Sequence, residues 1–123
     1  MKKILLIEDD PLLIDIYTRK LKEAGFLVLL MTEGNHKVLG MIKTEKPDLV
    51  ILDIVLPRVD GWEILRAIKR DEDVKDTRVM VLSNLGQKEE IEKGLKLGAE
   101  SYLIKAHYTP SEIVQEVMKL INE

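Results

Sequence analysis

Residues 49–53 constrain the fold more than any other part of the sequence. Four apolar residues run straight into Asp53, and Pro57 follows shortly after. A continuous apolar run that ends at a breaker is typical of a strand buried on both faces of a parallel sheet. Open sheets of this kind place their ligands at the carboxyl ends of their strands. Asp53 is therefore either the start of a turn or part of a site at that edge.

The pattern of an apolar run ending in polar residues recurs along the chain. Residues 3–7 end in Glu8-Asp9-Asp10, residues 79–82 end in Ser83, and residues 102–104 end in Lys105. Segments with helical spacing separate the runs. The predicted strands cover residues 3–7, 26–31, 48–53, 79–82 and 102–104, and the helices cover 11–24, 32–46, 61–70, 88–97 and about 110–121. This alternation predicts an α/β fold of the flavodoxin-like (βα)5 type, a five-stranded parallel sheet in the order 2-1-3-4-5 with helices on both faces.

Length and composition bound the possible functions. The 123 residues predict a single domain over 1–123, and the formal net charge of -3 argues against direct binding of nucleic acid. The chain has no cysteine, hence no disulfide and no thiolate metal site. The first apolar run is too short for a signal peptide, and none approaches the roughly 20 residues of a membrane span. We expect a cytoplasmic protein with no membrane contact.

The polar residues at the strand ends should meet in one crevice. Several carboxylates gathered in one place repel each other, and a hard divalent cation is the ordinary compensation. Oxygen ligands without histidine or cysteine favour Mg²⁺. An aspartate in such a site can act as a nucleophile and form an aspartyl phosphate. In that reaction Mg²⁺, Lys105, and Ser83 with the backbone N–H of Asn84 would each hold one oxygen of the phosphoryl group.

The motifs together resemble the receiver domain of bacterial response regulators, and the match covers essentially the whole chain. The residues that carry it are ILLIED at 4–9, DLVILDIVLP at 48–57, DG at 60–61, VLS at 81–83 and GAESYLIK at 98–105. The resemblance implies a signalling phosphoacceptor rather than an enzyme, one that supports its own phosphorylation and its slow dephosphorylation.

The resemblance also assigns roles to the site residues. Asp53 would be the phosphoacceptor, and Lys105 would pair with the phosphoryl group. Asp9 would bind Mg²⁺ directly, Glu8 would act through metal-bound water, and the backbone carbonyl of Val55 would be a further ligand. Asp10 would be a neighbour of the site. Ser83 and Tyr102 would form a switch pair, in which the hydroxyl moves toward the phosphate and the ring turns inward behind it.

The implied partners are proteins. The donor would be a phosphohistidine on a histidine kinase or a phosphotransfer protein. A downstream protein, or a second copy in a homodimer, would bind the face of the last two helices and the fifth strand. We expect a stand-alone regulator, and the receiver part of a longer protein is the alternative that stays open.

Three departures from the family pattern affect the expected chemistry. Ala106 follows Lys105 where the family usually has proline, so the Lys105–Ala106 peptide could be trans, which could move Lys105. Asn84 is larger than the usual residue, and Ser83 lacks the methyl group of threonine, which would loosen its coupling to Tyr102. Val55 and Leu85 are both apolar and cannot position a water molecule. We therefore predict slow hydrolysis of the aspartyl phosphate.

Other hypotheses compete with the receiver. A flavin-binding module would need a phosphate-cradling loop where Glu8-Asp9-Asp10 stands, and a phosphatase with an aspartyl nucleophile would need a second aspartate at position 55. A degenerate receiver used as a scaffold would not need the full acidic set. We expect His36 and His107 to be surface residues and Trp62 to pack at a helix start. Gly94 favours either a mobile helix or a close packing contact.

Overall fold

The strand predicted before Asp53 is β3 (Leu49–Leu52), which occupies the centre of the sheet. The computed structural model describes residues 1–122. In chain order its other elements are β1 (Lys3–Ile7), α1 (Pro11–Glu23), β2 (Leu27–Met31), α2 (Lys37–Glu45), β4 (Val55–Leu56), β5 (Val59–Asp60), α3 (Gly61–Arg70), β6 (Val79–Ser83), α4 (Lys88–Lys96), β7 (Ser101–Ile104), the 3-10 helix η1 (Lys105–His107) and α5 (Pro110–Ile121).

Five parallel strands form the main sheet, in the order β2-β1-β3-β6-β7. Because β6 and β7 are its fourth and fifth strands, the predicted order 2-1-3-4-5 is confirmed. The direction of winding changes at β1, where Ile7 pairs with Met31 on one side and with Leu52 on the other. The crevice expected at this switch point therefore lies where Glu8 and Asp53 leave their strands.

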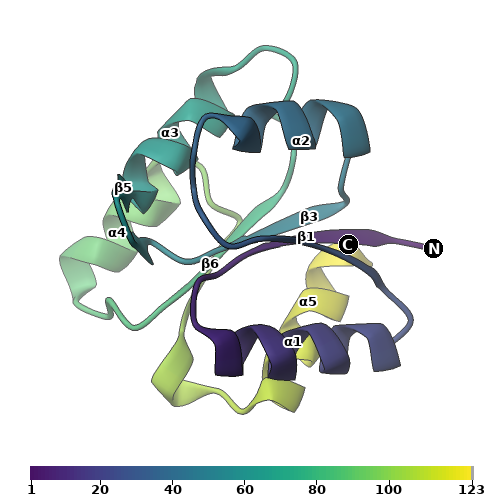
Figure 1. Cartoon of the computed structure of the whole chain (residues 1–123). Helices are drawn as coiled ribbons and strands as arrows, with labels where there is room; N and C mark the ends of the chain where they lie inside the picture. Colours follow the sequence, from purple (N-terminus) through teal and green to yellow (C-terminus); the bar gives the residue numbers. More distant parts are fainter. Residues whose placement is uncertain (123) are drawn as a thin grey trace.

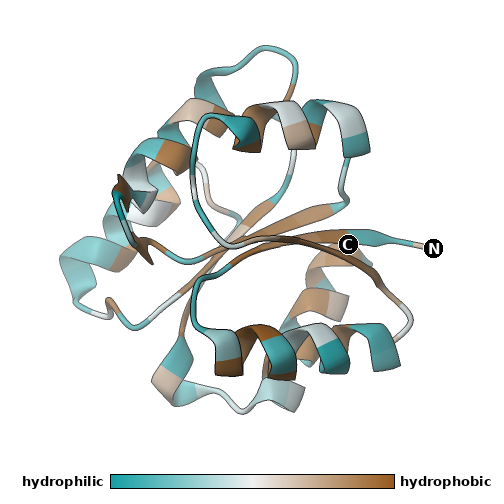
Figure 2. Cartoon of the chain, viewed as in Figure 1, coloured by the Kyte–Doolittle hydropathy of each residue, from teal (hydrophilic) through white to brown (hydrophobic). Residues whose placement is uncertain are grey.

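Helices cover both faces of the sheet, α2, α3 and α4 on one side and α1 and α5 on the other (Figure 1). The four residues of β3 are at most 1% exposed and alternate between two apolar clusters. Val50 and Leu52 pack on the α2–α3 side, and Leu49 and Ile51 pack on the α1–α5 side. Figure 2 shows the strands as apolar along their length, while the helices turn hydrophilic residues outward. This double burial explains the continuous apolar run in the sequence.

The segment after Asp53, predicted as a loop, contains a short antiparallel hairpin. Val55 pairs with Asp60 and Leu56 with Val59, and Arg58 takes a left-handed conformation (φ 66°) in the turn between them. Leu56 is 8% exposed and anchors the hairpin in the core, whereas Val55 on the same strand is 55% exposed. The hairpin ends at Asp60, whose side chain accepts a hydrogen bond from the backbone N–H of Trp62 (3.0 Å) and so caps α3.

Helix α2 begins at Lys37, later than the predicted start at Thr32. Gly34 is buried, and a Cβ built on it would lie 2.0 Å from Cδ1 of Ile64. The Asn35 side chain accepts a hydrogen bond from the backbone N–H of Lys37 (2.8 Å). The close approach of Gly34 to α3 and this local turn keep residues 32–36 out of the helix.

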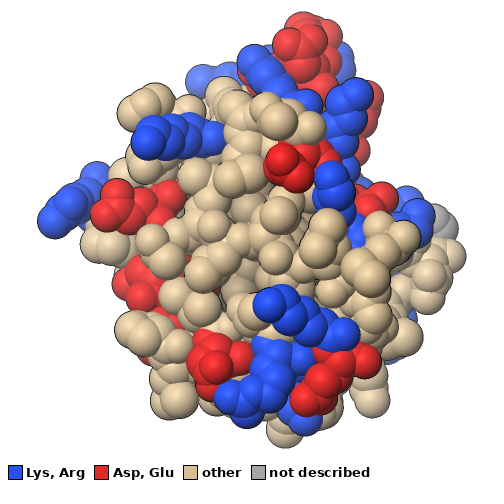
Figure 3. All heavy atoms as spheres, turned by 45° about the vertical axis from the view of Figure 1, so that its right-hand side comes forward, with Lys and Arg blue, Asp and Glu red and all other residues tan. Residues whose placement is uncertain are grey.

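Several surface features can be compared with the sequence. No helix within residues 1–122 is long and apolar enough to cross a membrane. The face shown in Figure 3 carries Lys and Arg side chains next to Asp and Glu side chains, around a broad uncharged area. His36 and His107 are exposed, and Trp62 is buried at the start of α3, as predicted.

Candidate functional site

A pocket of about 330 Å³ opens at the carboxyl ends of the central strands. It is lined by Glu8, Asp9, Asp10, Asp53, Val55, Asn84, Leu85 and Lys105. We call it the carboxylate pocket. The structure thus brings together most of the residues that the sequence singled out, although they come from four separate segments of the chain.

Asp53 is held from both sides of its carboxylate. It is 5% exposed, its Oδ1 accepts a hydrogen bond from the backbone N–H of Val55 (3.0 Å), and its Oδ2 lies 2.7 Å from Nζ of Lys105. No cis peptide bond occurs within residues 1–122, so Lys105 reaches Asp53 from a trans loop that continues into η1. Replacement of the usual proline by Ala106 therefore has not moved the ammonium group out of the pocket.

Lys105 also contacts Glu8, since its Nζ lies 2.7 Å from Oε1 of that residue. Burial by itself lowers the pKa of Lys105, but the hydrogen bonds to Asp53 and Glu8 outweigh it, and the pKa is raised above its ordinary value. Glu8 is 1% exposed, and its Oε2 accepts hydrogen bonds from the backbone N–H groups of Asp9 (3.0 Å) and Asp10 (3.2 Å). One lysine thus bridges two buried carboxylates, a contact that sequence reasoning had not assigned to Glu8.

The acidic residues include a group suited to a metal ion. One carboxylate oxygen each from Glu8, Asp9 and Asp53 lie within 4.8 Å of one another. Opposite ligands of an octahedral Mg²⁺ ion are about 4.2 Å apart, because each ligand lies about 2.1 Å from the ion. Asp9 is exposed, and within residues 1–122 its carboxylate has no hydrogen-bond partner. The donor set and the close approach of its oxygens therefore fit a hard divalent cation, with water as a further ligand.

Asp10 has a different task from its two acidic neighbours. Its Oδ1 accepts hydrogen bonds from the backbone N–H groups of Leu12 (2.9 Å) and Leu13 (3.3 Å), and it caps the start of α1. Its side chain is occupied by two of the free N–H groups that begin the helix. Asp10 thus lines the pocket while its side chain caps α1.

Ser83 and Tyr102 are connected through Leu85. Ser83 is fully buried at the end of β6, is not among the residues that line the pocket, and its Oγ accepts a hydrogen bond from the backbone N–H of Leu85 (3.3 Å). The Tyr102 hydroxyl donates to the backbone carbonyl of Leu85 (2.6 Å). Burial, followed by the charges of Glu90 and Asp53, raises the pKa of Tyr102 to about 12. The role of Leu85 comes from its backbone, so no side-chain pattern could have predicted it.

Tyr17 is a second residue that sequence reasoning passed over. It lies on α1, is 5% exposed, and burial raises its pKa, with smaller effects from the charges of Lys105 and Glu8. Its helical spacing with Leu13 and Leu21 gave the only available signal, and that signal predicts core packing.

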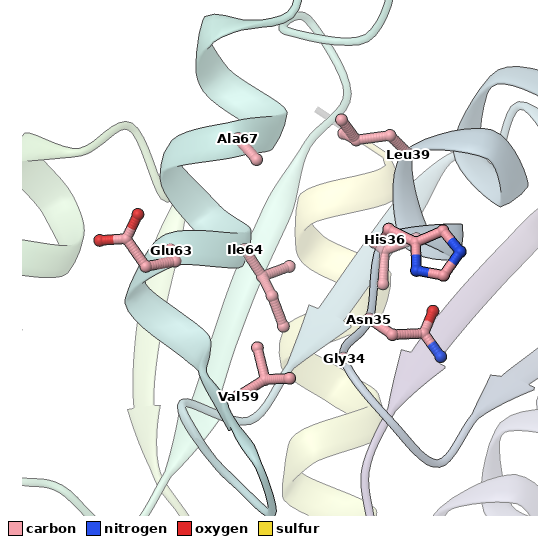
Figure 4. Close-up of a pocket in the computed structure, with 9 residues that line it drawn as sticks. Gly34, Asn35, His36, Leu39, Val59, Glu63, Ile64 and Ala67 are labelled. Atoms are coloured by element: carbon pink, nitrogen blue, oxygen red, sulfur yellow. The ribbon is translucent and has the colours of Figure 1, made fainter.

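A larger pocket, of about 450 Å³, lies between α2 and α3. Figure 4 shows Leu39 from α2 and Ile64 and Ala67 from α3 on opposite sides of it, with Val59 below. It is lined almost entirely by apolar atoms and shares no lining residue with the carboxylate pocket. It offers no set of charged groups that could carry out the chemistry expected from the sequence.

Comparison with known proteins gives the carboxylate pocket its context. Residues 4–118 match the response regulator receiver domain family. The chain belongs to this family. Receiver domains are signalling phosphoacceptors of two-component systems and interact with histidine kinases, which confirms the resemblance drawn from the motifs and decides against the flavin-binding module and the phosphatase.

Relatives and solved structures agree with this assignment. The transcriptional regulatory protein CusR of Escherichia coli is 39% identical over 120 residues, which are 97% of this chain and 51% of CusR. The BeF₃-activated receiver domain of Klebsiella pneumoniae RstA has a TM-score of 0.87 at 26% identity, covering 99% of this chain and 100% of that one. The Mn²⁺-bound response regulator Rcp1 has a TM-score of 0.81 at 25% identity, covering 97% and 93%. The chain spans about half the length of the curated relatives it matches.

Proposed function

We propose that residues 1–123 form one receiver domain in which Asp53 accepts a phosphoryl group. The observation that supports this most directly is the ion pair between Lys105 Nζ and Asp53 Oδ2 (2.7 Å), in a pocket that also holds Glu8 and Asp9. The lysine would keep Asp53 ionised and ready to attack, and would then stabilise the charge that develops on the transferred group.

The donor in this proposal is the phosphohistidine of a histidine kinase or of a phosphotransfer protein. Oδ of Asp53 attacks phosphorus, the O–P bond forms as the P–N bond breaks, and the imidazole leaves as a neutral ring after taking up a proton. Lys105 would hold one of the three equatorial oxygens, Ser83 with the backbone N–H of Asn84 would hold a second, and the third is left to the metal ion. The family membership supports this donor class.

Mg²⁺ is the proposed cofactor, and Asp9, Asp53, the carbonyl of Val55 and, through water, Glu8 would hold it. When bound, it would neutralise charge on the carboxylates and on the phosphoryl oxygens. Support comes from the all-oxygen group of Glu8, Asp9 and Asp53 and from the Mn²⁺ that the related Rcp1 binds. Val55 lines the pocket, which supports including it among the proposed ligands.

Phosphorylation would change the surface formed by α4, β7 and α5, through Ser83 and Tyr102. That surface would bind a downstream protein or a second copy of the chain. We further propose that the domain works in the cytoplasm and does not itself contact nucleic acid. A longer protein that contains it could still bind DNA, because relatives such as CusR are transcriptional regulators.

Intact mass after incubation with acetyl phosphate tests the proposal. The wild type should gain one phosphoryl group in the presence of Mg²⁺ and none in its absence, and Asp53→Asn should gain none. Asp60→Asn is the matched control, because Asp60 caps α3 outside the pocket and asparagine also caps helices well. No addition to the wild type under any condition would instead support the scaffold hypothesis.

A further inference from the structure

The ring of Tyr102, on strand β7, rests against an aromatic residue of helix α3. Its centroid lies 6.4 Å from that of Trp62, with an angle of 29° between the ring planes. Trp62 is the second residue of α3 and is 8% exposed. Lys93 of α4 places its Nζ 4.5 Å from the centroid of Trp62. The indole is therefore held in place at the edge of the hydrophobic core, and it can restrict the positions open to the Tyr102 ring.

Gly94 of α4 provides the space that the Tyr102 ring occupies. A Cβ at position 94 would lie 2.7 Å from Cδ2 and 3.1 Å from Cε2 of Tyr102, and 3.5 Å from Cζ3 of Trp62. Carbon atoms do not approach to 2.7 Å, so any side chain at this position would displace the tyrosine. Gly40 of α2 differs, because a Cβ there would meet nothing within 4 Å. The glycine of α4 thus has a specific packing reason, which is the second of the two explanations that the sequence left open.

The same ring reaches the loop that carries the pocket residues Asn84 and Leu85. The Tyr102 hydroxyl donates a hydrogen bond to the Leu85 carbonyl, and the N–H of Leu85 in turn donates one to Ser83 Oγ. A substitution at Gly94 or Trp62 that displaced the ring would therefore shift the backbone between Ser83 and Leu85.

We propose that Trp62 and Gly94 are positioning residues that hold the Tyr102 ring against the β6–α4 loop before phosphorylation and thereby raise the affinity of the carboxylate pocket for a phosphoryl group. This inference rests on the proposed function. Coupling between two sites is reciprocal, so a ring already held in the position that phosphorylation favours increases phosphoryl affinity by the same factor. If only a fraction of the molecules holds the ring in this position, the apparent affinity for the phosphoryl group falls to that fraction of the intrinsic affinity.

Beryllofluoride with Mg²⁺ is the probe, and calorimetry measures its affinity, since the Trp62 variants lose the one tryptophan of the chain. Gly94→Ala and Trp62→Leu should each weaken binding by about three- to tenfold, the range expected for loss of an aromatic contact. Trp62→Phe should retain most of the affinity because it keeps a ring. Gly40→Ala should bind like the wild type.

Stability measurements separate positioning from general damage. Across the four variants, the change in the free energy of unfolding in urea should not correlate with the change in beryllofluoride affinity. Gly40→Ala and Gly94→Ala replace similar helical glycines, but only Gly94 lies against Tyr102. In a Tyr102→Ala background the ring is gone, so Gly94→Ala should no longer weaken beryllofluoride binding. A double-mutant cycle reports this coupling directly.

Three results would overturn the inference. Unchanged affinity in Gly94→Ala and Trp62→Leu, with the wild type binding beryllofluoride normally, would refute the positioning role and leave the proposed function intact. Additive effects of Gly94→Ala and Tyr102→Ala would refute it as well. A wild type that binds no beryllofluoride and gains no phosphoryl group from acetyl phosphate would refute both the inference and the proposed function.

Discussion

The carboxylate pocket and the contact around Tyr102 lie at the same edge of the sheet but are held together by different forces. In the pocket, Lys105 bridges two buried carboxylates at 2.7 Å each, and backbone N–H groups occupy their other oxygens. Around Tyr102 the contacts are ring packing, a glycine, and one neutral hydrogen bond to Leu85. The first region should respond to added charge, and the second to changes of shape.

This difference suggests that the two regions have separate roles in the response to phosphorylation. A phosphoryl group or a cation delivered to Asp53 changes the charge balance of the pocket, and hydrogen bonds to charged groups are the stronger ones. The Tyr102 side chain is neutral and is connected to the pocket through the Leu85 backbone. The following predictions test whether the two regions can be perturbed separately.

Loss of Lys105 should have the largest effect on stability. Lys105→Met leaves Glu8 and Asp53 buried without their counter-charge, which should lower the free energy of unfolding by about 3 kcal/mol or more. Mg²⁺ should restore part of the loss, because it binds the same carboxylates in the folded state only. Urea unfolding with and without Mg²⁺ measures both effects. Lys96→Met, at an exposed position of α4, is the control and should be neutral. Equal stability of Lys105→Met and the wild type without Mg²⁺ would contradict the charge-based account of the pocket.

Tyr102 should make stability depend on alkaline pH. Its pKa is raised to about 12 in the folded state from an ordinary value of 10.0, so folding favours the neutral phenol. Its contribution is complete below the unfolded pKa and is lost as the pH rises through the folded pKa. Between these two values the wild type should lose more stability than Tyr102→Phe. Parallel pH profiles of the two proteins in urea unfolding would show that the phenol is not held by its surroundings.

Val55 should control the lifetime of the phosphorylated state. The phosphorylated wild type should decay slowly in Mg²⁺ buffer, because Val55 and Leu85 offer no hydrogen bond to an attacking water. Val55→Asn adds one such group, worth about 0.5–1.5 kcal/mol, which corresponds to at most about a tenfold faster decay. Release of inorganic phosphate measures the rate, and Val55→Ile is the control. Rapid decay of the wild type would refute the slow-hydrolysis prediction.

The smallest effect is expected outside both regions. Thr109 caps α5 in a reciprocal pair of hydrogen bonds with Glu112 (2.8 and 3.1 Å). Thr109→Ala should cost about 1 kcal/mol of stability and leave phosphoryl uptake unchanged. Thr109→Ser should retain the cap. A loss of uptake in Thr109→Ala would mean that the start of α5 is coupled to the neighbouring Lys105 loop, and that the division between the regions is less sharp than proposed.

Local patterns in the sequence predicted much of this architecture. Residue patterns predict the double burial of β3 and the capping box of α5, and the alternation of strands and helices with the rules of connection predicts the strand order. All three are present in the structure. The hairpin of β4 and β5 was missed because two-residue strands carry no periodic signal. The late start of α2 was missed because it depends on the contact of Gly34 with Ile64, far along the chain.

The sequence by itself determined which residues gather at the carboxyl ends of the strands, because parallel strands bring their ends to one edge whatever the side-chain detail. Only the tertiary structure decided how those residues share their contacts. In the folded chain Lys105 contacts Glu8 as well as Asp53. Asp10 caps a helix. Tyr102 packs against Trp62 and Gly94 and donates a hydrogen bond to the Leu85 carbonyl. These contacts connect residues distant in the chain, and several use backbone groups, which every residue carries and no sequence pattern can single out.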